Sequence, residues 1–230
     1  MEIAYKFTDS YTVAGREFPN EYSLSFSIVS EMECVDLGLS VKWATCNLGA
    51  SKPTEYGGYY QWAGTKDVSD TKIYLDWDNC PYHTGSSSTS GWTKYNTRSS
   101  YGTVDNKTVL EAKDDVAHVK LGGKWRMPTD AEWTELMAKC TWTWVTNYNG
   151  SGINGRLVKA TNGNSIFLPA AGYRRGTCLN DAGSYGFYWS SSLYTGYPGY
   201  AWYVYFYSDS VGGSNYYLRF YGQSVRPVSE

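Results

Sequence analysis

The chain has 230 residues and a formal net charge of −2, so it is long enough for one large domain and close to neutral. No lysine follows Lys159, so the C-terminal part offers little positive charge for phosphates, and we expect no nucleic-acid partner. No long apolar run is present, so we expect no direct insertion into a membrane.

The composition favours a location outside the cell. With 24 Gly, 23 Tyr and 10 Trp and modest charge, the chain is typical of a loop-rich extracellular or particle-borne fold. Its start, MEIAYKFTDSYTV, has neither the basic nor the apolar segment of a secretory signal. Either a leader has been removed or export uses another route, such as assembly into a virion. We therefore expect a cell-surface or virion protein, for example of a phage tail.

Residues 1–32 are predicted to form a small N-terminal β extension or linker. In EYSLSFSIVS, four apolar residues alternate with polar ones, which is the period of a strand. They are Tyr22, Leu24, Phe26 and Ile28. The dipeptide Pro19-Asn20 indicates a turn between this strand and an earlier one near AYKFT.

Residues 33–230 are predicted to form the main domain. CVDLGLSVKWATCNLGA predicts one or two strands, and the segment after Pro53 predicts a short helix. Residues 66–108 are polar and read as a long surface loop, and DDVAHV predicts a brief helix. The strongest helix signal is TDAEWTELMAKC, where Thr129 and Glu132 form a capping box. One buried face then follows at helical spacing: Trp133, Leu136, Met137 and Cys140.

Only strand signals follow the helix, in segments such as GRLVKA, SIFLPAAG, FYWSSS and AWYVYFYS. Few helices early and many short strands late indicate an α+β fold.

Five cysteines are present without zinc-type spacing: Cys34, Cys46, Cys80, Cys140 and Cys178. We expect buried free thiols. The alternative is one disulfide, and then Cys46 and Cys140 are the most suitable pair because each lies in a predicted core element.

The C-terminal part is unusually rich in tyrosine. In YAWYVYFYSDSVGGSNYYLRFYG, residues 200–222, ten side chains are aromatic and most others are small and polar. Alternation in AWYVYFYS predicts an inward face of Trp202, Val204 and Phe206. The intervening tyrosines lie on the second face, either under a loop or open to solvent. Tyrosine with Ser, Gly and Asn is also the composition of antibody combining sites, since tyrosine offers rigid contact area and a hydroxyl. The structural alternative is that these rings only stabilise a sheet.

Three segments together resemble a known family. GGKWRMPTDAEWTEL (122–136) is similar to the signature of the formylglycine-generating-enzyme branch of the C-type-lectin fold. VDLGLSVKWATCNLGA (35–50) and the motifs LPAAGYRRGT, GSYGFYWSSSLYT and GQSVRPV within 168–228 are similar to surface and phage-associated domains of Bacteroides-type bacteria. Several of these are variable proteins of diversity-generating retroelements. The resemblance implies a C-type-lectin-like α+β domain of the formylglycine-generating-enzyme type, with a Tyr-rich variable region at about 185–223.

The resemblance and the composition together predict a ligand-binding face. Fourteen residues are candidates because the family pattern is open there and this chain carries an aromatic or small polar residue. They are Tyr185, Phe187, Tyr197, Tyr200, Tyr203, Tyr207, Asp209, Ser210, Asn215, Tyr216, Tyr217, Phe220, Tyr221 and Gln223. Trp189, Trp202 and Phe206 are expected in the core, and Tyr205 is left open between framework and binding.

Other chemistry is poorly supported. The related oxidases need a cysteine pair near the C-terminus, and here Cys178 has no nearby partner, so we expect no enzymatic activity, no catalytic residue and no cofactor. His83 is expected in solvent and His118 on a helix surface or at a cap. Calcium-lectin motifs are absent, so no metal site is predicted, although DWDN (76–79) with Asp70 offers oxygen ligands that suit a structural calcium ion.

Further expectations concern one tryptophan and four arginines of the scaffold. Trp125 is expected in the core, and Arg126 is expected to pair with a carboxylate. Arg226 is expected to pair with a buried carboxylate or with backbone carbonyls. Arg174 or Arg175 is expected either to border the binding face or to be solvated.

The leading hypothesis is a non-enzymatic, retroelement-diversified adhesin or phage receptor-binding protein. Its partner would be an unknown protein or glycan on a cell surface. The alternative is a structural or interaction domain of a surface lipoprotein or pilus tip. An oxidase is the weakest hypothesis.

Overall fold

The computed structural model describes residues 2–13, 16–27, 32–86 and 89–230. Contacts divide the chain into two compact units, Met1–Glu31 and Met32–Glu230. In the described part of the chain, no helix is both long and apolar enough to cross a membrane.

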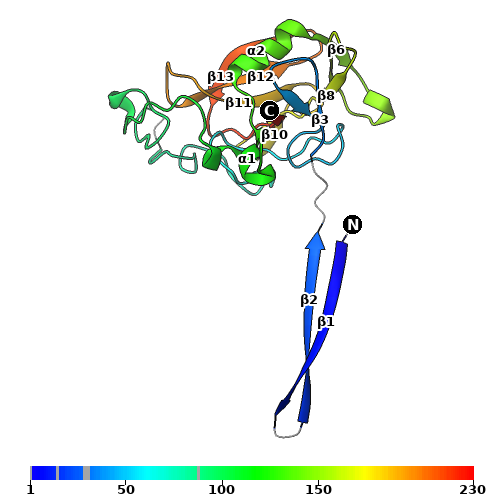
Figure 1. Ribbon diagram of the computed structural model, residues 1–230. Helices are drawn as coiled ribbons and strands as arrows, with labels where there is room; N and C mark the ends of the chain where they lie inside the picture. Colours follow the sequence, from blue (N-terminus) through cyan, green and yellow to red (C-terminus); the bar gives the residue numbers. More distant parts are fainter. Residues whose placement is uncertain (1, 14–15, 28–31, 87–88) are drawn as a thin grey trace. The chain divides into compact units, whose positions relative to one another are not determined.

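The first unit is an antiparallel hairpin of β1 (Glu2–Val13) and β2 (Arg16–Ser27) (Figure 1). The expected turn at Pro19-Asn20 is wrong, because these residues pair with Ser10 and Asp9 inside the hairpin. Proline is tolerated there since each strand of a two-stranded sheet is an edge strand. Ile28, expected on the same face as Tyr22, lies outside the described residues.

The second unit is rich in β-structure and poor in helix, which is compatible with a lectin-like β-rich fold. Its strands form four small sheets with the orders β3-β4-β14-β5, β6-β7-β8, β9-β10 and β11-β12-β13. The strands are β3 (Cys34–Val35), β4 (Lys42–Ala44), β5 (Trp125–Arg126), β6 (Thr141–Val145), β7 (Gly155–Lys159), β8 (Ser165–Pro169), β9 (Tyr173–Arg175), β10 (Cys178–Asn180), β11 (Gly186–Leu193), β12 (Tyr200–Phe206), β13 (Val211–Leu218) and β14 (Val228–Ser229). Short 3-10 turns lie at Ser99–Tyr101, Ala112–Asp114 and Tyr148–Gly150.

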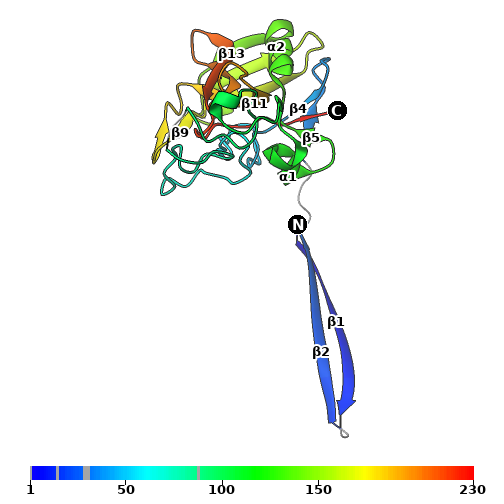
Figure 2. The same cartoon turned by 90° about the vertical axis from the view of Figure 1, so that its left-hand side faces the viewer.

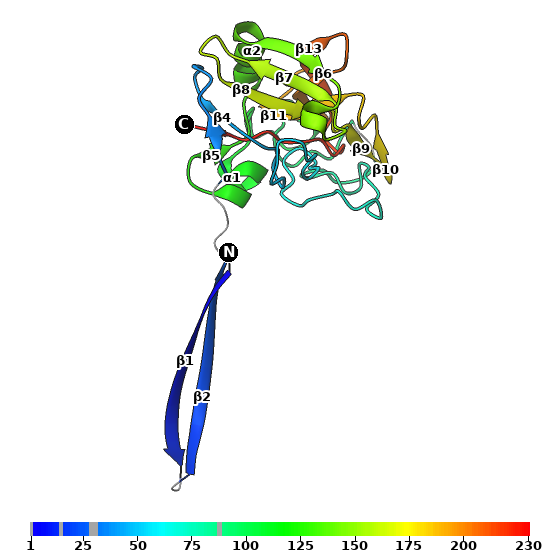
Figure 3. The ribbon, with the colours of Figure 1, turned by 90° about the vertical axis from the view of Figure 1, so that its right-hand side faces the viewer.

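The predicted capped helix is confirmed as α2 (Asp130–Lys139). The Thr129 side chain accepts from the Glu132 N–H, and the Glu132 carboxylate accepts from the Thr129 N–H, so both free donors are satisfied. Trp133 and Leu136 are fully buried, and the helix contacts all three strands of the β11-β12-β13 sheet. Figure 3 shows α2 at the same end of the unit as β7 and β8. Met137 and Cys140, expected on the buried face, are half-buried.

The two shorter helical predictions had opposite outcomes. DDVAHV does form α1 (Val116–Leu121), with Asp115 as its N-cap. The segment after Pro53 forms turns instead of a helix. Gly57 has a φ of +74° there, a left-handed conformation that interrupts a helix, and Gly58 leaves room for the Tyr60 hydroxyl.

Two hydrophobic cores lie on opposite faces of the β11-β12-β13 sheet. One face, which carries Trp189 and Tyr203, packs with buried residues from the segment 59–117. The other face, with Val204 and Phe206, packs with α2 and with β7 and β8. The central sheet is therefore covered on both sides. Of the two alternatives for the β12 tyrosines, burial on the second face holds for Tyr203, whereas Tyr205 is half-buried.

The segment 66–108 supplies part of the first core, although its polar composition predicted a surface loop. It has little regular structure (Figure 2), but Val68, Leu75, Trp92 and Tyr95 are buried. These apolar residues stand singly among polar ones, so no local pattern marks them. His83 is buried as well, contrary to expectation, between the rings of Trp77 and Trp92.

All five cysteines are free. Cys46 and Cys80 are buried, Cys140 is half-buried, and Cys34 and Cys178 are exposed. The alternative of a bridge from Cys46 to Cys140 is therefore wrong, and the expectation of burial holds for only part of the set.

Candidate functional site

The sheet β11-β12-β13 brings the C-terminal aromatic residues together. Phe187 on β11 pairs with Tyr205 on β12, and Trp189 pairs with Tyr203, so these four side chains share one face of the sheet. Gly212 on β13 permits this packing, because a Cβ there would lie 2.3 Å from the Tyr205 ring.

One group of rings, here named the tyrosine cluster, has a buried base and a half-buried rim. The base consists of Phe187, Tyr203 and Tyr221. The rim consists of Tyr173, Tyr185, Tyr205, Tyr207 and Tyr217. The Tyr203 and Tyr217 ring centroids are 5.4 Å apart, and the Tyr185 and Tyr207 centroids are 5.1 Å apart. Each rim ring thus rests against a neighbour, which holds it in place.

Three phenols of the cluster have raised pKa values. Burial raises the pKa of Tyr203 and Tyr217 above the ordinary tyrosine value, and the neighbouring Tyr205 and Tyr173 add to this effect. Burial likewise raises the pKa of Tyr221. These hydroxyls are therefore neutral near pH 7 and can both donate and accept hydrogen bonds. The cluster therefore offers ring faces and hydroxyls to a ligand.

A second group of rings, here named the outer aromatic group, comes from the other face of β12. It consists of Tyr194, Tyr197, Tyr200, Trp202 and Tyr216. The Tyr194 and Tyr216 rings are stacked with centroids 4.0 Å apart, and Tyr216 is 41% exposed. Trp202, expected in the core, is half-buried, because its ring packs against Tyr194 and Tyr216 and belongs to neither core. Trp189 and Phe206 are in the core as predicted.

The fourteen predicted binding residues differ in how far their side chains are exposed to solvent. Nine are half-buried or exposed: Tyr185, Tyr197, Tyr200, Tyr207, Asp209, Ser210, Asn215, Tyr216 and Tyr217. Five are buried, so their expected exposure is wrong: Phe187, Tyr203, Phe220, Tyr221 and Gln223. Their binding role remains a prediction.

Each buried candidate has a physical reason for its burial. Phe187, Tyr203 and Tyr221 form the base of the tyrosine cluster. Phe220 packs edge-on against Trp77 of the segment 66–108, with centroids 4.7 Å apart. The backbone of Gln223 pairs with Tyr60, and its side chain is fully enclosed.

The polar candidates Asp209, which is exposed, and Ser210, which is half-buried, lie in the turn between β12 and β13, where the Tyr207 N–H donates to the Ser210 carbonyl. Asn215 is exposed on β13. Sequence reasoning missed one member of the tyrosine cluster, Tyr173, and one member of the outer aromatic group, Tyr194. Tyr173 lies before the Tyr-rich stretch, and Tyr194 sits inside it without a distinguishing pattern, so only the topology identifies them.

A hollow of about 390 Å³ borders the tyrosine cluster. Arg175 and Phe220 line it, and the Arg175 guanidinium lies 5.7 Å from the centroid of the Tyr221 ring. The neighbouring Arg174 is buried, which corrects the expectation of a border or solvated position. Its guanidinium donates to the backbone carbonyls of Val68, Asp70, Ile73 and Thr177.

The signature segment 122–136 serves the scaffold. Trp125 is buried as expected, and Arg126 donates two hydrogen bonds to the Glu132 carboxylate, at 2.8 and 2.6 Å, which confirms the predicted pairing. Arg226 is fully buried and donates to the carbonyls of Ala44 and Phe167, as one of the two expectations had it.

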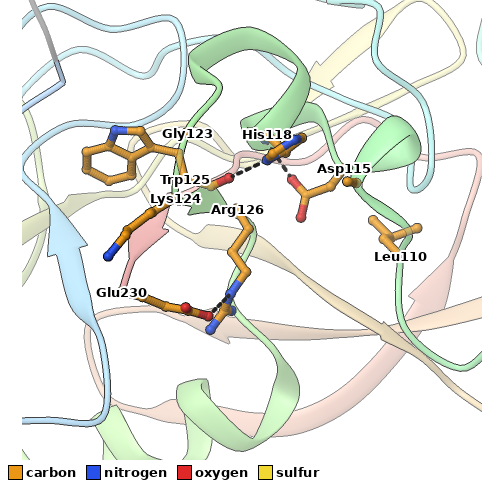
Figure 4. A pocket seen from close by; sticks show the side chains of 9 residues that line it. Leu110, Asp115, His118, Gly123, Lys124, Trp125, Arg126 and Glu230 are labelled. Carbon is orange, nitrogen blue, oxygen red and sulfur yellow. Dashed lines mark hydrogen bonds and ion pairs between the residues drawn. The ribbon is translucent and has the colours of Figure 1, made fainter.

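A pocket of about 310 Å³ lies beside this signature (Figure 4). Its polar groups already have structural partners. Asp115 accepts from three backbone N–H groups, including that of Met127 at 2.8 Å, and burial raises its pKa. His118, half-buried on α1, has its Nδ1 3.2 Å from the Trp125 carbonyl oxygen. These contacts of Asp115 and His118 hold the signature segment in place.

The oxygen ligands considered for calcium serve local turns. Asp70 accepts from the Lys72 N–H, and Asp76 accepts from the Asp78 N–H. Among the residues that the structure describes, no three His, Cys, Asp or Glu side chains are grouped as a metal site would require.

Comparison with known families gives one match. The profile of the Lcl C-terminal domain matches residues 66–229, which include α2, the tyrosine cluster and the outer aromatic group. Neither the curated proteins nor the solved structures contain a significant match to the chain.

Proposed function

We propose a function for this chain on the premise that it belongs to the Lcl C-terminal domain family. It is a non-enzymatic binding protein whose tyrosine cluster contacts a protein or glycan on a cell surface. The sequence resemblance to retroelement-diversified variable proteins supports the further proposal of an adhesin or phage receptor-binding protein, located on a cell surface or a virion. We also propose that the chain has the C-type-lectin-like fold of the formylglycine-generating-enzyme type.

One observation carries this proposal: five half-buried tyrosines surround a buried aromatic base on one face of the central sheet. Rings held in this way lose little conformational freedom when a ligand binds, which is the advantage that tyrosine gives antibody combining sites. The turn with Asp209 and Ser210 adds adaptable polar groups next to Tyr207.

The location of the cluster also supports diversification. Most of its members lie within residues 185–223, and the rim tyrosines are only half-buried where they pack at the edge of the first core. Substitutions at the rim change the ligand-facing surface while the base and the capped helix keep the fold.

The outer aromatic group allows a matched control for the test. We would compare a variant with Tyr185→Ala and Tyr207→Ala against a variant with Tyr200→Ala and Tyr216→Ala, in a screen of immobilised neutral and acidic oligosaccharides and of bacterial cells. Each variant loses two half-buried or exposed tyrosines: Tyr185 and Tyr207 adjoin the ends of β11 and β12, and Tyr200 and Tyr216 lie on β12 and β13. Binding should weaken about tenfold or more in the first variant, as for interface hot spots, and change about twofold or less in the second.

The opposite ranking would contradict the assignment of the binding face. It would favour the second candidate function, a structural or interaction domain of a surface lipoprotein or pilus tip. The observation behind that candidate is the outer aromatic group itself, since exposed stacked rings are suited to packing against another subunit. Light scattering after size-exclusion chromatography would then show self-association that the second variant abolishes.

A further inference from the structure

The hollow beside the tyrosine cluster is built from two segments that are fixed to each other. One is Tyr74–Asp76 of the long loop, and the other is the turn between β9 and β10. Leu75 and Gly176 exchange two backbone hydrogen bonds, of 3.1 and 3.2 Å, across this junction. Gly176 has a φ of +54°, a left-handed backbone conformation that favours glycine at this turn.

Arg175 supplies a positive charge at the border of the hollow. It is exposed, and no carboxylate pairs with it among the residues that the structure describes. Because Arg174 is committed to four backbone carbonyls, the strand that carries Arg175 is fixed. The Tyr221 ring under its guanidinium holds the cation near the cluster through a cation–π contact.

The other lining groups are those that recognise a hydroxylated ring. Tyr74, which is 60% exposed, and Phe220 offer aromatic surfaces. The Thr177 hydroxyl, the Asn180 amide and the Asp76 carboxylate offer donors and acceptors. The volume of about 390 Å³ lies in the range of small-molecule sites.

We propose that this hollow is a subsite for an acidic sugar, whose carboxylate pairs with Arg175 and whose ring lies between Tyr74 and Phe220. The inference rests on the proposed function, since it names the ligand class of the same face. Guanidinium groups pair with carboxylates in a planar two-bond geometry. In this subsite Asp76 accepts hydrogen bonds from sugar hydroxyls.

The test uses two sugars that differ only at carbon 6. Methyl β-D-glucuronide carries a carboxylate there, and methyl β-D-glucopyranoside carries a hydroxymethyl group. Titrations of the full chain, followed by amide chemical shifts in NMR spectra, should show at least a tenfold preference for the glucuronide. Arg175→Gln should abolish that preference, Arg175→Lys should retain part of it, and Arg98→Gln at another exposed arginine should leave it unchanged.

Equal binding of the two sugars, or an unchanged preference in Arg175→Gln, would overturn the subsite. Equal binding of N-acetyl-aspartate amide would also overturn it, because the site would then recognise a carboxylate without the sugar. The proposed function is tested separately. If the glucuronide preference is absent, the Tyr185 and Tyr207 substitutions should still weaken binding in the screen of cells and oligosaccharides.

Discussion

The burial of Tyr203 leads to a quantitative prediction, because the structure places this ring in the base of the cluster and not on the surface. Its side chain is 5% exposed and contacts the rings of Phe187, Trp189 and Tyr217. A buried tyrosine removes about 150–250 Å² from water, which at about 25 cal/mol per Å² gives about 4–6 kcal/mol as an upper bound. Residual compactness of the unfolded chain lowers this gain, so Tyr203→Ala should cost about 3–5 kcal/mol.

The assay is equilibrium unfolding in urea followed by tryptophan fluorescence. All ten tryptophans lie after residue 42, so the signal reports on the second unit alone. Tyr207→Ala is the matched control on the rim and should cost about 1 kcal/mol, while Tyr203→Phe keeps the ring and should cost about 1.5 kcal/mol or less. A loss below about 1 kcal/mol for Tyr203→Ala would refute the assignment of this residue to the base.

Three further predictions concern the scaffold. Burial opposes ionisation of Glu132, but hydrogen bonds from Arg126 and from the helix cap outweigh it and hold its pKa below the ordinary value. The ionised carboxylate therefore stabilises the folded protein. This stabilisation is complete above the ordinary pKa and is lost as the pH falls through the lowered pKa. Urea midpoints between pH 7 and pH 3 should therefore fall less steeply in Glu132→Gln than in the parent. Iodoacetamide followed by mass spectrometry should modify exposed Cys178 in the folded protein but Cys80, whose pKa burial raises to about 12, only after unfolding. Arg226→Met leaves buried carbonyls without donors and should cost about 3–5 kcal/mol in the same urea assay, whereas a cost within about 0.5 kcal/mol would contradict the described contacts.

Local signals were sufficient where a feature depends on neighbouring residues. The cap of α2 needs only Thr129 and Glu132, and its buried face needs only the spacing of Trp133 and Leu136. Asp115 likewise begins α1 through its own side chain. Such features were predicted correctly because all the partners lie within one or two turns of the chain.

Features that depend on distant segments were not predictable. Alternation in β12 correctly separates Tyr203 from Val204, but it does not say what covers each face. The cover over Tyr203 comes from a segment more than a hundred residues earlier, in which Trp92 and Tyr95 stand among polar residues. The same limit applies to Arg174 and Arg175, which are adjacent and identical in type, yet one is buried and the other is exposed.

The division of the tyrosine cluster into base and rim limits which positions can vary freely. A domain with a total stability of about 5–15 kcal/mol loses a large share of it when one base ring is removed. Variation at Phe187 or Tyr203 is therefore costly, whereas variation at Tyr185 or Tyr207 changes the surface at little cost. A diversified binding face on this fold thus depends on a base that stays aromatic, and the tyrosine excess of the segment serves both purposes at once: the inner rings maintain the sheet, and the outer rings meet the ligand.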